Sequence, residues 1–89
     1  MEETQWREEA YKKAFDGMIK YINMHREAGK GFSIQDLEAM LQTEYDRDGL
    51  AWDGRGEVVT IGISANISAM EQELIKWRKE LAQSLIEQP

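Results

Sequence analysis

The feature that most constrains this chain is a regular series of apolar residues over positions 59–85. Its members follow one another at steps of 4, 4, 3, 4, 3, 4 and 4 residues: Val59, Ile63, Ile67, Met70, Leu74, Trp77, Leu81 and Leu85. Steps of three and four keep side chains on one face of an α-helix. The series, called the apolar stripe below, therefore predicts one long helix that begins between residues 57 and 64 and ends near residue 86.

Two alternatives concern the start of this helix. Residues 57–63 are rich in β-branched side chains, which is typical of a short β segment. A strand there would pair only with residues 50–52, and such a short hairpin is marginal by itself. Ser68 and Glu71 have capping-box spacing, so a start at Ser68 is a second alternative. We favour the long helix because the periodicity is unbroken from Val59 onward.

Residues 4–28 form the first predicted helix. Its apolar face is the series Tyr11, Phe15, Met18, Ile22 and His25, at steps of four and three. Thr4 is a suitable N-cap. Two glycines, at positions 29 and 31, predict the end of the helix.

Residues 33–47 form a second, shorter helix with a strong start signal. Ser33 and Asp36 have the spacing of a capping box, and Phe32 and Leu37 have the spacing of a hydrophobic staple. Residues 48–56 follow as a loop, because the segment contains three glycines and two Asp-Gly pairs. Leu50 and Trp52 are the large apolar residues of that loop.

Length and composition predict a single all-α domain over residues 1–89, with two long helices and one short one. A chain of 89 residues has a thin core, and small domains often add a disulfide, a metal or a second subunit. Cysteine is absent and there is one histidine, so a second subunit is the expected addition. We therefore expect a homodimer, in a reducing, cytoplasmic compartment. No signal peptide or membrane span is predicted.

The charge distribution disfavours generic binding to nucleic acid. The net charge is −6, and residues 31–57 hold seven acids against Arg47 and Arg55. Phosphate binding depends on Lys and Arg, which an acidic segment opposes. The alternative of a small DNA-associated accessory factor would need a basic face on adjacent helices, formed by Arg7, Lys12, Lys13, Lys76, Arg78 and Lys79.

The acidic segment is similar to the first half of a calcium-binding EF-hand loop. Glu44, Asp46 and Asp48 alternate ahead of Gly49, but position 12 of such a loop would be Arg55 instead of glutamate. A weak divalent-cation site is therefore a further alternative. Its candidate ligands are Asp46, Asp48, Asp53 and Glu57.

No catalytic or cofactor machinery is predicted. His25 is the single histidine, and no serine has the features of a nucleophile beside it. The glycine-rich residues 53–57 match neither a P-loop nor a dinucleotide fingerprint, and two acids would repel a phosphate there. We expect a protein that is not an enzyme and that needs no cofactor.

The predicted function is a protein–protein interaction module, acting as a small adaptor or regulatory subunit. The last helix would be about 40 Å long, and the second helix covers only about half that length. Part of the apolar stripe should therefore stay uncovered, which marks an interface with a second copy or another protein. The candidate interaction residues are Val59, Ile63, Trp77, Leu81, Leu85 and Trp6.

Overall fold

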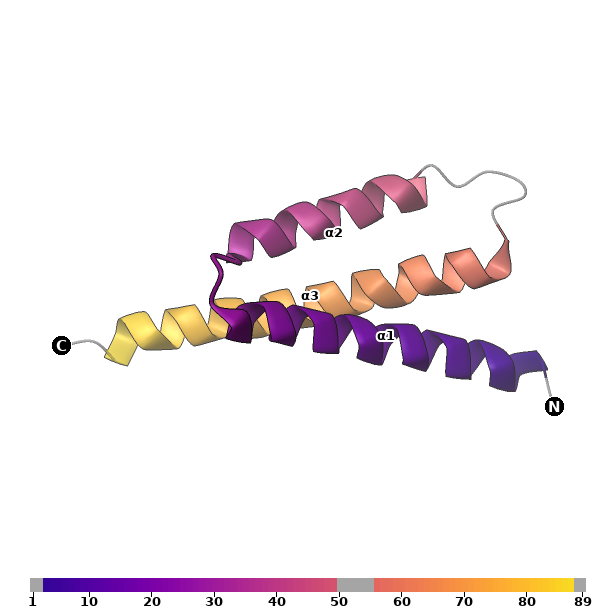
Figure 1. The fold of residues 1–89 in the computed structure, drawn as a ribbon, viewed down its shortest axis with the longest axis horizontal. Helices are drawn as coiled ribbons and strands as arrows, with labels where there is room; N and C mark the ends of the chain where they lie inside the picture. Colours follow the sequence, from indigo (N-terminus) through magenta and orange to yellow (C-terminus); the bar gives the residue numbers. More distant parts are fainter. Residues whose placement is uncertain (1–2, 50–55, 88–89) are drawn as a thin grey trace.

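Three helices make up the part of the chain that the structure, a computed structural model, describes, namely residues 3–49 and 56–87 (Figure 1). They are α1 (Glu3–Ala28), α2 (Ile34–Gly49) and α3 (Glu57–Glu87). The predicted all-α class, with two long helices and a short one, is confirmed. Residues 57–63 are the first turns of α3, so the strand alternative is wrong. A lone strand would have lacked a partner for its backbone groups, whereas a helix bonds them internally.

Helix α3 is the central element, and the other two helices pack along it. Figure 1 shows α1 running parallel to α3 and α2 running back in the opposite direction. Cross-helix polar pairs follow this order: Arg7–Glu57 and Arg26–Glu80 join α1 to α3, and Tyr45–Glu71 and Glu38–Arg78 join α2 to α3. The apolar stripe of α3 is therefore covered from two sides over its middle.

The core lies where all three helices meet. Its buried members are Ile22 from α1, Leu37 and Leu41 from α2, and Met70 and Leu74 from α3. Burying side chains of this size stabilises a fold by about 1.5–3 kcal/mol each. This cluster of five among the described residues is small, as the thin predicted core implies.

The start of α2 is the predicted capping box. The backbone N–H of Asp36 donates to Ser33 Oγ at 3.2 Å, and the backbone N–H of Ser33 donates to the Asp36 carboxylate at 2.8 Å. The helix continues to Gly49, two residues beyond the predicted end, so residues 48 and 49 are helical instead of loop. Arg47 in this last turn favours the extension, because a cation stabilises the negative end of a helix. Leu50 and Trp52 lie outside the described residues.

Glycines mark the ends of the two long helices as the sequence predicts. Gly29 and Gly31 follow α1 with φ of 63° and 82°, and Gly56 precedes α3 with φ of 81°. These left-handed conformations favour residues without a Cβ atom. The later start at Ser68 is wrong, since Ser68 lies within α3 and its Oγ accepts a hydrogen bond from Tyr11 Oη at 2.8 Å.

The molecule is elongated and open. Its extents are 55 × 29 × 22 Å, and its radius of gyration is 15.6 Å, whereas a compact domain of 89 residues has about 12 Å. No helix among the described residues combines the length and the apolarity that crossing a membrane requires.

The capping box yields a stability prediction. Ser33→Ala removes the acceptor for the Asp36 N–H and should lower the free energy of unfolding by about 1 kcal/mol. Gln35→Ala, at an exposed neighbouring position in the same turn, is the control and should change it by less than about 0.5 kcal/mol. Urea denaturation measures both, and equal effects would contradict a specific role for the cap.

Candidate functional site

The apolar stripe of α3 is buried in its middle and exposed at both ends. Ile63, Met70 and Leu74 are 2–5% exposed, whereas Val59 is 44%, Leu81 is 47% and Leu85 is 74% exposed. This corrects the prediction for Ile63, which belongs to the packed part of the stripe and not to a free surface. Leu81 and Leu85 are the members of the predicted set that the structure leaves most clearly uncovered.

The C-terminal part of α3 extends beyond its two neighbours. Figure 1 shows it projecting past the end of α1 and the beginning of α2. Arg78 pairs with Glu38 of α2 and Glu80 pairs with Arg26 of α1, and seven residues of α3 follow Glu80. Seven helical residues span about 10 Å. Leu81 and Leu85 therefore lie on a helix end that α1 and α2 do not cover.

Trp77 sits at the base of this projecting end and is engaged within the chain. The Arg26 guanidinium lies 4.2 Å from its ring centroid, and the Phe32 ring stacks on it at 6.0 Å. Arg26 also donates to Glu80 at 2.6 Å. These contacts fix the direction in which α3 leaves the core. Trp6, another predicted interaction residue, is partly buried near the opposite end, with the Arg7 guanidinium 5.6 Å from its ring.

A second row of exposed residues on α3, three apolar and one basic, adjoins the stripe. Ile75, Arg78, Ala82 and Leu85 are spaced by three, four and three residues, and all four are exposed. We call these residues, together with Leu81, the α3 end surface. Ile75 and Ala82 are not among the predicted interaction residues, although their helical spacing from Leu85 is a signal that could have indicated them.

A groove between α2 and α3 continues the α3 end surface toward the core. It has a volume of about 290 Å³. Its lining residues are Leu41, Tyr45, Glu71, Leu74, Ile75 and Arg78. Tyr45 Oη donates to the Glu71 carboxylate at 2.7 Å, and this hydrogen bond, burial and the negative charge raise the pKa of Tyr45. The pair joins the two helices across the groove.

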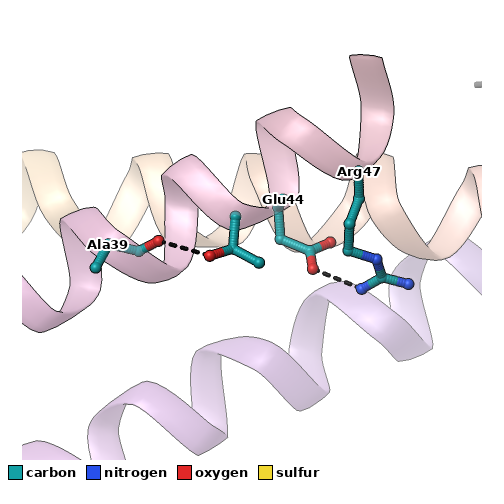
Figure 2. A network of polar contacts seen from close by, with 4 residues as sticks. Ala39, Glu44 and Arg47 are labelled. Atoms are coloured by element: carbon teal, nitrogen blue, oxygen red, sulfur yellow. Dashed lines mark hydrogen bonds and ion pairs between the residues drawn. The ribbon is translucent and has the colours of Figure 1, made fainter. Parts of the chain in front are cut away.

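Two glutamates are buried inside the helical packing. Glu44 is 7% exposed and accepts a hydrogen bond from Arg47 at 2.6 Å, as Figure 2 shows. Glu73 is 2% exposed. Within the described part of the chain, one carboxylate oxygen of each is buried without a hydrogen-bond partner. Such an oxygen costs about 1–3 kcal/mol of stability.

The predicted cation ligands are not brought together. Asp46 and Asp48 are two residues apart on α2, and residues at that spacing do not share a helix face. Asp46 accepts a hydrogen bond from Gln42 at 3.1 Å, and Glu57 pairs with Arg7. Asp53 lies outside the described residues. Over residues 3–49 and 56–87, no three acidic or histidine side chains gather in a metal-binding arrangement.

The predicted basic face is divided into two groups. Because α1 and α3 run parallel with Arg26 beside Glu80, the bases at 76–79 lie near the end of α1. Lys12 and Lys13 lie more than ten residues earlier on α1, which is about 15 Å or more along the helix. Acids of the chain neutralise part of both groups, through Arg7–Glu57, Lys12–Asp16 and Arg78–Glu38.

His25 lies at the junction between α1 and α2. Its ring is 4.3 Å from the Tyr21 ring and 5.4 Å from the Phe32 ring, between centroids. An open cavity beside it is lined by His25 and Phe32, and also by Asp36, whose carboxylate is used in the capping box. The imidazole therefore belongs to a row of aromatic contacts that ends on Trp77.

Comparison with known proteins finds no match to this chain among family models, curated proteins or solved structures. Among the described residues, the α3 end surface carries Ile75, Leu81 and Leu85, which are 54%, 47% and 74% exposed.

Replacing Glu73 tests whether its buried carboxylate stabilises or destabilises the fold. Glu73→Met keeps a helix-forming side chain of similar length and removes the unpartnered carboxylate oxygen. The free energy of unfolding should rise by about 1–3 kcal/mol. Gln72→Met, at the exposed neighbouring position, serves as the control and should leave it nearly unchanged. Destabilisation by Glu73→Met in urea denaturation would contradict this assignment.

Arg26 yields a prediction about titration. Its hydrogen bond and charge, with a smaller contribution from Lys76, hold the pKa of Glu80 below the ordinary value. A lowered folded-state pKa means that the pair stabilises the fold above the ordinary glutamate pKa, and that this contribution disappears as pH falls through the lowered value. Arg26→Gln should raise the pKa of Glu80 in an NMR carboxyl titration. Lys12→Gln, which breaks the Lys12–Asp16 pair on α1, should leave it unchanged.

Proposed function

We propose that this protein is a non-enzymatic interaction module that binds protein through the α3 end surface, as a homodimer or with another protein. In this role it is a small adaptor or regulatory subunit of the cytoplasm. The cysteine-free composition fits a reducing compartment. His25 makes ring contacts with Tyr21 and Phe32, which accounts for the one histidine without a catalytic role.

The observation that carries the proposal is the excess of accessible surface. The chain exposes 6518 Å². A compact monomer of 10.3 kDa exposes about 5,400 Å². The difference, about 1,100 Å², exceeds the roughly 800 Å² that each partner buries in a standard protein–protein interface. Leu81 and Leu85 are 47% and 74% exposed, and an exposed apolar patch is typical of an interaction site.

The two alternative functions receive less support. A DNA-associated factor needs adjacent, unneutralised bases, whereas the chain pairs Arg7, Lys12 and Arg78 with its own acids. A weak divalent-cation binder needs several oxygens around one point, and Asp46 and Asp48 lie on different faces of α2. Neither alternative uses the exposed leucines of α3.

Self-association tests the proposal. We expect light scattering to report a dimer whose population grows with protein concentration, and Leu85→Asp to weaken dimerisation by at least about tenfold, because a charge would be buried at the interface. Gln83→Asp, two residues away on another face of α3, should have little effect. A wild-type chain that stays monomeric at millimolar concentration would remove the homodimer, and capture experiments with Leu85→Asp would then test a different partner.

A further inference from the structure

We propose that the occupant of the α3 end surface is a second copy of this chain, with the two α3 helices antiparallel and Leu85 of each copy seated in the α2–α3 groove of the other. This inference rests on the proposed function and adds the geometry of the contact. It follows from the order of side chains along the surface, from the position of the groove and from the area that a dimer requires.

The order of side chains is complementary to itself when two copies run in opposite directions. A twofold interface requires the same patch on both chains, with each residue facing its counterpart in reverse order. Placing Ile75 opposite the second copy's Leu85 also places Arg78 opposite the second copy's Ala82. The two bulky apolar residues then meet, and the long stem of an arginine covers a small alanine. Leu81 lies near the twofold axis and meets its own copy.

The groove lies where this register brings the second copy's Leu85. Ile75 is 54% exposed and forms one wall of the groove, and Leu41, Tyr45 and Leu74 supply further apolar surface. Leu85, at 74% exposed, is the most exposed of the large apolar side chains whose exposure the structure describes. The pairing therefore gives Leu85 of each copy a cavity in the other, twice per dimer.

The area that a stable interface requires favours this register over contact at the tips of α3. Seven residues beyond Glu80 form about two turns of helix. Two such tips would bury far less than the roughly 800 Å² per partner of a standard interface. Extending the contact back to Ile75 and onto α2 adds the groove and Tyr45, which is 40% exposed, to the area that the dimer buries.

A parallel pairing is disfavoured by packing. It would place Leu85 of one chain opposite Leu85 of the other at the projecting ends, and it would leave both grooves empty. Each copy also carries a net charge of −6, so two copies repel one another at long range. Dimer affinity should therefore rise with ionic strength, whereas a partner held by opposite charge would be lost as salt increases.

Distance measurement between spin labels tests the geometry. The chain contains no cysteine, so Ser64→Cys on the exposed surface of α3 places a single label on each copy. Residue 64 is sixteen positions from residue 80, the centre of the proposed pairing, so the two labels should lie about 50 Å apart. A parallel pair would bring the helix axes at residue 64 within about 10 Å. Pulsed electron–electron double resonance distinguishes these two distances.

A matched pair of variants tests the register. Ala82→Arg places a second long side chain opposite Arg78 of the other copy and should weaken dimerisation by at least about tenfold, while Gln83→Arg on another face should not. A dimer with a short label distance, or one insensitive to Ala82→Arg, overturns the antiparallel pairing and leaves the proposed function standing. A labelled chain that stays monomeric at millimolar concentration overturns both the pairing and the homodimer.

Discussion

The structure depends on one constraint: the stripe of α3 is longer than the rest of the chain can cover. Its middle is enclosed by Ile22 of α1 and by Leu37 and Leu41 of α2, and there the side chains of α3 are almost fully buried. Helix α2 has 16 residues and α3 has 31, so α2 covers only part of the length of α3. The elongated shape, the exposed leucines and the projecting helix end all follow from this difference in length.

Much of the fold could be predicted from residue spacing, because spacing determines which side chains share a helix face. The long helix and the Ser33–Asp36 cap were both predicted, whereas the start of that helix was predicted only as a range from residue 57 to residue 64 and lies at Glu57. The end of α2 was harder to predict, because Asp48-Gly49 is a turn signal and yet both residues belong to the last turn of the helix. Local turn signals compete with continuation of the helix, and the free-energy difference between ending and continuing it is small.

The candidate site was predictable only in part, because exposure depends on where neighbouring helices end. Spacing assigned Ile63 and Leu85 to the same stripe, yet Ile63 is 3% exposed and Leu85 is 74% exposed. The buried Glu73 has no signal in the sequence, since glutamate at that position fits a solvated helix face equally well. The α2–α3 groove also arises from the relative placement of two helices, which periodicity within each helix does not determine.

The parallel arrangement of α1 and α3 has a consequence for how the chain folds. Tyr11 bonds Ser68, and Arg26 bonds Glu80, across separations of 57 and 54 residues. Contacts this distant are unusual for helical domains, which mostly fold through local pairings, and closing so long a segment is entropically costly. During synthesis the apolar face of α1 must wait for α3 to emerge from the ribosome, and until then it is a surface to which chaperones could bind.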